Sequence, residues 1–166
     1  TSTTDIPVAI QWSNTAPYFA TNSRSVDYVE ATPGVRLAGE DVVGDGDSAD
    51  FDGGELRIAV TSATAATDAL TIGGVAGVSL TRDELVGGGT TIGVLDPSSS
   101  ATQLVFALNA QATAATVQAA VRSARFQTTS PNTGVGNREV SFSLSDGDGG
   151  TSFLRKVAVN IQALPS

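Results

Sequence analysis

Cysteine and histidine are both absent from this chain of 166 residues. Without cysteine, neither a disulfide framework nor a thiolate site can form. Without histidine, the chain lacks the commonest acid–base residue, the Ser-His-Asp triad and the usual ligands of zinc and copper. The two absences exclude the most frequent kinds of catalytic and transition-metal site.

Basic residues and long apolar runs are also scarce. Nine Lys and Arg residues stand against 17 Asp and Glu residues, which gives a net charge of -8 and a pI near 4.2. Nucleic acids and anionic membrane surfaces repel such a chain. No apolar run approaches the roughly 20 residues that span a bilayer as a helix. We therefore expect no nucleic-acid partner and no membrane insertion.

What the chain does contain is short runs in which apolar and polar residues alternate. Alternation with a period of two, between turns rich in Gly, Asp, Asn and Pro, is typical of half-buried antiparallel strands. Together with 18 glycines and 5 % aromatic residues, it predicts an all-β antiparallel sandwich. The runs are centred on Val26–Tyr28, Leu56–Val60, Leu70–Ile72, Val78–Leu80, Leu104–Leu108, Val140–Leu144 and Val157–Ile161, and residues 35–43 are expected to form a further strand.

One segment favours a helix instead. Residues 113–124 contain no Gly or Pro, and Val117, Ala120, Val121 and Ala124 recur at helical spacing after a potential N-cap at Thr113. We predict one short helix that either closes an end of the sandwich or crosses between its sheets. We expect residues 1–24 to form an N-terminal edge strand or linker and residues 25–166 to form one module.

Acidic residues concentrate in two loops. Residues 40–55 hold 7 of the 17 carboxylates, and a smaller copy, S-D-G-D-G-G-T, begins at Ser145. Crowded carboxylates repel one another, and an all-oxygen ligand set suits calcium better than any transition metal. The spacing excludes an EF-hand, because positions 5 and 12 counted from Asp45 are Ala49 and Leu56. A calcium-binding β-roll is excluded because it needs tandem copies of its repeat.

The two loops are expected to meet if the strands that precede them run toward the same end of the sandwich. Glu30, with Asp83 and Glu84, would then lie at the opposite end. The plain alternative is that Asp and Gly occupy these loops only because both residues favour turns. The candidate metal ligands are Glu30, Asp45, Asp47, Asp50, Asp52, Asp146 and Asp148.

Three stretches resemble the cadherin-like repeats of large bacterial RTX-type surface adhesins. They are Tyr28-x-Glu30, G-D-G-D-S-A-D-F-D-G-G-E-L from Gly44, and S-L-S-D-G-D-G-G-T-S from Ser143. The resemblance implies a β-sandwich module in an end-to-end string that calcium stiffens at the cell surface. It also implies that Glu30, Asp45 and Asp47 match the early glutamate and Asp-x-Asp positions, and that Asp146 and Asp148 match the last acidic turn.

We therefore expect a non-enzymatic, calcium-stabilised extender module of a secreted or cell-surface adhesin. Its expected partners are neighbouring modules of the same chain, with a host or surface ligand as a further possibility. The first alternative is a module that binds a glycan or peptide through its calcium. A glycosidase-like enzyme is disfavoured, because paired catalytic carboxylates sit in grooves lined by sugar-stacking aromatics and only Phe51 lies inside the acidic loop.

Overall fold

The computed structural model describes residues 14–20, 23–29, 34–46, 48–62, 67–75, 77–128 and 137–162. These residues form an all-β, sandwich-like fold with one short helix, as predicted. The strands are β1 (Tyr18–Phe19), β2 (Ser23–Val29), β3 (Val35–Arg36), β4 (Val43–Gly44), β5 (Glu55–Val60), β6 (Asp68–Thr71), β7 (Val78–Thr81), β8 (Glu84–Gly87), β9 (Thr90–Leu95), β10 (Gln103–Leu108), β11 (Arg125–Thr128), β12 (Arg138–Ser145) and β13 (Arg155–Gln162), and the helix is α1 (Ala114–Ser123).

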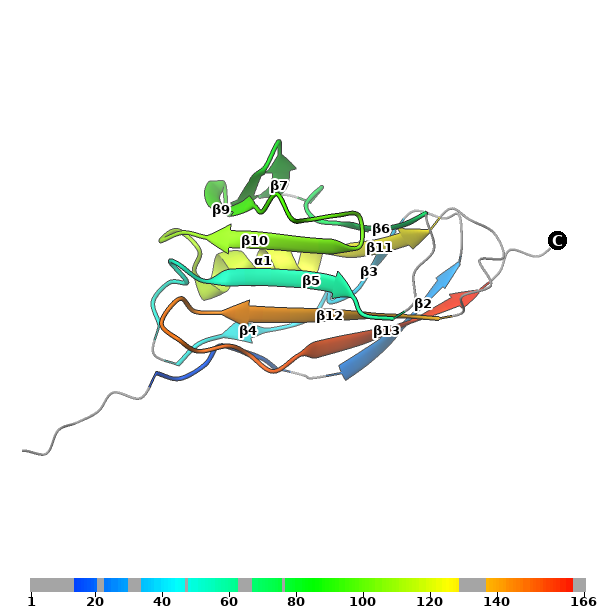
Figure 1. The fold of residues 1–166 in the computed structure, drawn as a ribbon, viewed down its shortest axis with the longest axis horizontal. Coiled ribbons are helices and arrows are strands. Elements are labelled where there is room, and N and C mark those ends of the chain that lie inside the picture. The colour runs from blue at the N-terminus through cyan, green and yellow to red at the C-terminus, as the bar shows by residue number, and fades with distance from the viewer. Residues whose placement is uncertain are drawn as a thin grey trace, which may run out of the picture.

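The larger layer is an eight-stranded sheet in the order β2-β13-β12-β5-β10-β9-β8-β7 (Figure 1). Its neighbouring strands run antiparallel except β2 and β13, which are parallel. The sandwich prediction did not include this parallel pair at the edge of the sheet. Alternation reports which face of a strand is buried and carries no information about the direction of its neighbour.

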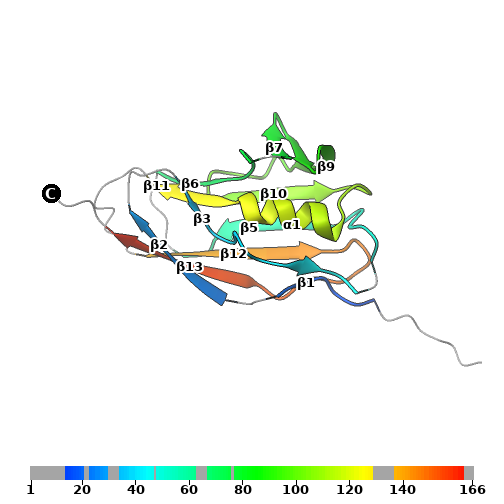
Figure 2. The same ribbon diagram turned by 180° about the vertical axis from the view of Figure 1, so that it is seen from behind.

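The second layer covers one face of the large sheet (Figure 2). It consists of the three-stranded sheet β3-β11-β6, the short pair β1-β4 and the helix α1. The core lies between the two layers, and it includes Ile58, Phe106 and Phe142 from the large sheet with Phe126 and Val117 from the second layer. The alternating residues of the sequence thus form the inner faces, as the sandwich prediction requires.

The helix begins and ends close to the predicted positions. Thr113 is its N-cap, and a capping box joins Thr113 and Thr116 reciprocally. Val117, Ala120 and Val121 are buried, and Ala124 is the C-cap. Because α1 follows β10 of the large sheet and precedes β11 of the small one, it is the crossover between the sheets.

The segment over residues 35–43 differs from the single strand that we predicted. It forms two short strands, β3 and β4, separated by a turn in which the Asp41 N–H donates to the Ala38 carbonyl. The Leu37 N–H donates to the carbonyl of Ala124 at 3.1 Å, which extends the pairing of β3 with β11 by one residue, to the C-cap of α1. Leu37 and Ala38, between the two short strands, are fully buried.

Candidate functional site

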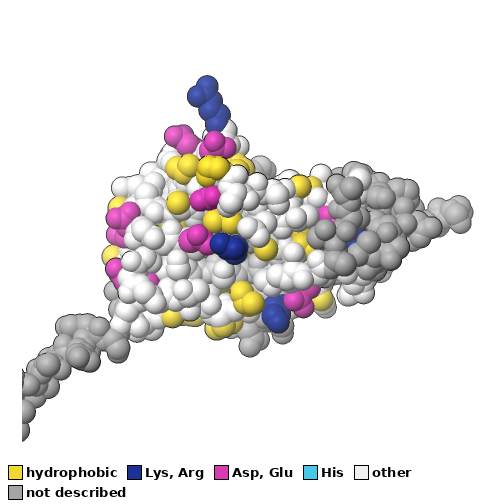
Figure 3. Space-filling model, in the orientation of Figure 1, with side chains coloured by type: hydrophobic (Ala, Val, Ile, Leu, Met, Phe, Trp, Pro, Cys, Tyr) yellow, Lys and Arg dark blue, Asp and Glu magenta, His cyan; other side chains and the backbone are white. Residues whose placement is uncertain are grey.

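The two acidic loops lie at the same end of the fold. β5 and β12 are antiparallel neighbours with Glu55 opposite Ser145, so the loop before β5 and the loop after β12 emerge side by side (Figure 1). The Glu55 N–H donates to the Ser145 hydroxyl at 2.9 Å. Acidic side chains are visible at this end of the surface in Figure 3.

The backbones of the two loops touch through glycine. Gly147 has a φ of 82°, and a Cβ added there would overlap the Asp52 carbonyl oxygen and lie 2.9 Å from the Gly54 nitrogen. Gly53, on the facing loop, also has a positive φ of 79°. Only a residue without a Cβ permits both this dihedral and this approach. Glycine at position 147 is therefore needed for the two loops to pack together.

Asp146 organises its own turn. Its carboxylate is 1 % exposed and accepts hydrogen bonds from the Asn14 side-chain amide at 2.6 Å, the Asp148 N–H at 2.8 Å and the Gly150 N–H at 3.0 Å. Burial raises the pKa of Asp146, but these hydrogen bonds lower it by more, so the pKa lies below its ordinary value. Asp146 thus ties the N-terminal segment to the acidic turn.

Two described carboxylates of the long loop also accept hydrogen bonds from nearby backbone. Asp45 Oδ1 accepts from the Ser48 N–H at 3.1 Å, and Asp50 Oδ1 accepts from the Asp52 N–H at 3.0 Å. Asp52 and Asp148 are exposed. Such local hydrogen bonds are expected if aspartate occupies these loops because it favours turns, which is the alternative to metal binding.

Within the described residues, no group of three or more acidic side chains is placed to hold a metal ion. Two predicted ligands, Glu30 and Asp47, lie outside those residues. Asp83 and Glu84, expected to lie near Glu30, are exposed at the turn between β7 and β8. The structure thus brings the two loops together around Asp52 and Gly147, and it describes five of the seven candidate ligands.

Asp41, which flanks the acidic loop, belongs to a buried ion pair. Arg155 Nε lies 2.6 Å from its Oδ2 and Arg155 Nη2 lies 2.7 Å from its Oδ1. The two side chains are only 3 % and 1 % exposed. Arg155 begins β13, whereas Asp41 precedes β4, so the pair joins the two layers at the acidic end.

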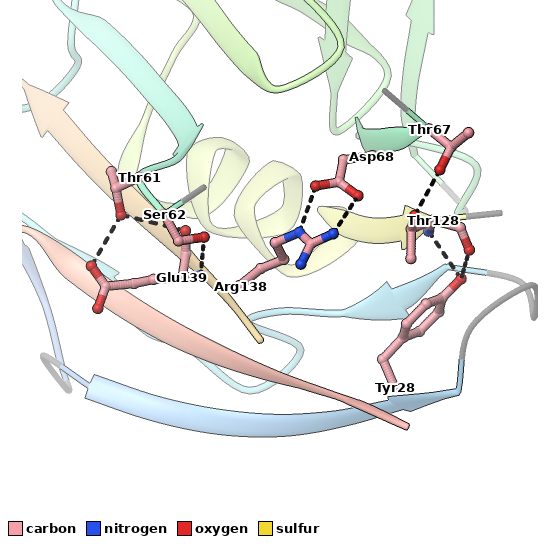
Figure 4. Close-up of polar contacts among 8 residues, drawn as sticks. All are labelled: Tyr28, Thr61, Ser62, Thr67, Asp68, Thr128, Arg138 and Glu139. Atoms are coloured by element: carbon pink, nitrogen blue, oxygen red, sulfur yellow. Dashed lines mark hydrogen bonds and ion pairs between the residues drawn. The ribbon is translucent and has the colours of Figure 1, made fainter. Parts of the chain in front are cut away.

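A second buried pair joins the layers through β6 and β12. Arg138 Nε lies 2.6 Å from Asp68 Oδ2, and both side chains are fully buried (Figure 4). Nearby, the Tyr28 hydroxyl donates to the Thr128 carbonyl at 3.2 Å and accepts from the Thr128 N–H at 3.1 Å. This network connects β2 and β12 of the large sheet with β6 and β11 of the small one.

Neither ion pair was predicted from the sequence, although the sequence contains a signal for both. Arg138 precedes Val140 and Phe142 by even steps, and Arg155 precedes Val157 and Val159 in the same way. Each arginine therefore occupies an inward-facing position of its strand. A charge at such a position needs a buried partner of opposite sign, but alternation alone does not say which of the 17 carboxylates supplies it.

Exposed apolar side chains also occur at the acidic end. Tyr18 is 46 % exposed, and Phe153 and Leu154, in the loop that contains Asp146, are 49 % and 50 % exposed. The Tyr18 ring packs over Gly44, where a Cβ would lie 2.5 Å from its Cζ. Aromatic residues therefore flank both acidic loops, although the sequence places only Phe51 within the longer one.

No family model matches the chain, and no curated protein matches it either. The resemblance to cadherin-like modules therefore stays a prediction from the three short motifs. Within the part of the chain that the structure describes, no helix has both the length and the apolar character needed to cross a membrane.

Proposed function

We propose that this chain is a non-catalytic, calcium-stabilised β-sandwich module that acts as a rigid extender in a large secreted or cell-surface adhesin. The observation that carries the proposal is the meeting of two Asp-rich loops at one end of the sandwich. Two adjacent loops that offer carboxylate and carbonyl oxygens, in a chain without histidine or cysteine, match the preference of calcium for oxygen ligands. The proposed ligands come from Asp45, Asp47, Asp50, Asp52 and Asp148, with Asp146 shaping the turn.

The path of the chain supports an extender role. Asn14, the first described residue, bonds to Asp146 at the acidic end. β13 starts near that end and runs away from it, so Gln162, the last described residue, lies toward the opposite end (Figure 1). Because the first and last described residues lie toward opposite ends of the sandwich, a force applied along the chain would act along the length of the module. Calcium at the joining end would stiffen the connection with the preceding module.

Thermal unfolding with calcium, with magnesium and with chelator tests the proposal. Calcium should raise the melting temperature, because a ligand that binds only the folded state stabilises it. Magnesium should do so less, since it dehydrates reluctantly and demands octahedral geometry. The expected affinity for calcium is in the range of about 10⁻⁴–10⁻³ M that extracellular modules show.

Two variants locate the effect. Asp47→Ala should largely remove the gain in melting temperature, whereas Asp27→Ala, at an exposed position on β2, should retain it. Identical unfolding of the unmodified chain in calcium and in chelator would refute the proposal. If Asp27→Ala abolished the gain as fully as Asp47→Ala, calcium would be acting through general charge screening.

A tandem of two copies tests the extender role separately. Small-angle X-ray scattering should give a longer maximum dimension and a narrower spread of shapes in calcium than in chelator. If the tandem were equally extended in both, calcium would stabilise the module without stiffening its connection.

The exposed aromatic residues at the acidic end favour a second candidate function. Tyr18 and Phe153 lie beside the acidic loops, and aromatic rings next to a bound cation suit a glycan or peptide ligand. Binding to a glycan or peptide array that chelator abolishes would support this function. Phe153→Ser should then remove array binding while leaving the calcium-dependent melting unchanged, and a calcium-responsive chain without array binding would favour the extender alone.

A further inference from the structure

Two arginines face each other on the outer surface of the small sheet. The register of β3 with β11 places Arg36 directly opposite Arg125. In β11, which lies in the second layer (Figure 2), Phe126 is buried and Arg125 is not. The arginine side of the strand therefore faces away from the core. Directly opposed residues of an antiparallel pair have Cβ atoms about 4.5–5.5 Å apart. Both guanidinium groups are therefore within reach of one small ligand.

Neither arginine forms an ion pair with another residue in the part of the chain that the structure describes. The ion pairs among the described residues belong to Arg57, Arg138 and Arg155. The sequence from Pro97 to Arg138, which contains β11, has no acidic residue. Like charges placed directly opposite on neighbouring strands are destabilising. In a chain with 17 acidic and 9 basic residues, an arginine pair without an acidic partner among the described residues points to an anion from outside the chain.

The aliphatic parts of the two arginine side chains lie beside two glycines, Gly34 and Gly39. A Cβ at Gly34 would lie 3.1 Å from Arg125 Cβ and 3.7 Å from its Cδ, and a Cβ at Gly39 would lie 3.6 Å from Arg36 Cδ. Arg125 Nε is buried and has no hydrogen-bond partner in the described part of the fold. An unsatisfied buried donor costs free energy and calls for an explanation. Because Arg125 Nε is enclosed by the fold, a ligand on the surface can be met only by the terminal nitrogens of this guanidinium group.

We propose that Arg36 and Arg125, with the Thr71 hydroxyl beside them, bind a phosphate or sulfate group on the outer face of β3-β11-β6. Thr71 is exposed and lies opposite Arg125 on its other side, on β6. Arginine presents a planar fork of N–H donors that matches oxyanion geometry, and two guanidinium groups balance a doubly charged anion. The site uses no residue of the acidic loops, so it is independent of the calcium proposal.

Titration followed by ¹H–¹⁵N NMR tests the site with inorganic sulfate and inorganic phosphate at constant ionic strength against chloride. Sulfate stabilises folded proteins generally because it is excluded from their surfaces, so the readout is residue-specific shifts rather than melting temperature. We expect saturable shifts at Arg36, Thr71 and Arg125. Arg36→Gln and Arg125→Gln should each weaken binding at least tenfold.

Arg24→Gln is the matched control, because it removes the same charge from an exposed position on β2 and should leave binding unchanged. Dextran sulfate against neutral dextran distinguishes the source of the group. Saturation by the free ions identifies a small anion, and arginine-dependent binding of dextran sulfate alone identifies a sulfate ester on a polymer. Shifts that grow linearly without saturation, or an equal loss in Arg24→Gln, would overturn the proposal.

Discussion

Arg155 donates two hydrogen bonds to the buried carboxylate of Asp41, at 2.6 and 2.7 Å. The contact spans 114 residues of sequence and joins the start of β13 to the turn before β4. Because the same turn leads into the acidic loop, this ion pair fixes the base from which that loop departs. A carboxylate that flanks the candidate metal ligands is thus used inside the protein.

Removal of one partner of this pair should be costly. We expect Arg155→Met to lower the free energy of unfolding by about 3–5 kcal/mol, because it leaves the Asp41 charge buried and unpaired. The double variant Asp41→Leu with Arg155→Met should recover most of that loss, since well-packed apolar residues often replace a buried pair at little cost. Urea denaturation measures all three proteins.

The control for this prediction is the exposed pair of Glu55 and Arg57, whose side chains are 44 % and 47 % exposed. Glu55→Gln should cost less than about 1 kcal/mol, because water screens surface pairs. Equal losses for Arg155→Met and Glu55→Gln would mean that the Asp41–Arg155 pair is solvated in solution.

Asp146 should make stability depend on pH. Its pKa in the folded protein lies below the ordinary value of 3.8, so its contribution is fully present above the pKa of the unfolded chain. That contribution is lost as the pH falls from about 5 through the folded pKa. In chelator, the difference in urea midpoint between the unmodified chain and Asp146→Asn should therefore be largest near pH 7 and shrink toward pH 3.

The comparison of two proteins is needed because the pKa of Asp96 is also lowered, by hydrogen bonds from Ser98. Its contribution has the same sign and cancels in the difference. A difference between the unmodified chain and Asp146→Asn that stays constant from pH 7 to pH 3 would contradict the prediction.

Local patterns predicted the fold well where one face of an element is buried. The alternation at Val140, Phe142 and Leu144 and the helical spacing from Val117 to Ala124 each identified the correct element and the correct inward face. Both the type of element and its inward face depend on packing between the two layers, so the spacing of the apolar residues reflects them directly.

Features that depend on distant contacts were not accessible in this way. The parallel pairing of β2 with β13 and the division of residues 35–43 into β3 and β4 depend on segments about 85 to 130 residues away. At the acidic end, composition identified the two loops that form the candidate site. It did not show that the Asp146 carboxylate accepts hydrogen bonds from Asn14 and from its own turn. The residue type alone does not reveal whether a carboxylate binds a cation, pairs with a guanidinium group or accepts hydrogen bonds from backbone N–H groups.

The capping box of α1 provides a third test. Thr113→Ala should lower the free energy of unfolding by about 1 kcal/mol, since it removes the acceptor for the Thr116 N–H. Thr116→Ala removes the reciprocal acceptor for the Thr113 N–H, at 2.8 Å. The double variant should lose less than the sum of the single variants, because the two threonines also bond each other at 3.3 Å. Strict additivity in urea denaturation would show that the box is not formed in solution.

The contact between the acidic loops can be isolated with two glycines of the same turn. Gly147 and Gly149 both have positive φ, of 82° and 98°. A Cβ at Gly147 would overlap the Asp52 carbonyl oxygen, whereas nothing lies within 4 Å of a Cβ at Gly149. Gly149→Ala should therefore cost only backbone strain, on the order of 1 kcal/mol, and Gly147→Ala should cost clearly more.

The same two variants connect the packing of the loops with the proposed calcium site. If ligands from both loops share the ion, Gly147→Ala should weaken calcium binding in calorimetry, because it forces the loops apart, and Gly149→Ala should retain it. Equal calcium affinity of the two variants would mean that one loop alone holds the ion. In that case the contact between Asp52 and Gly147 would serve stability only.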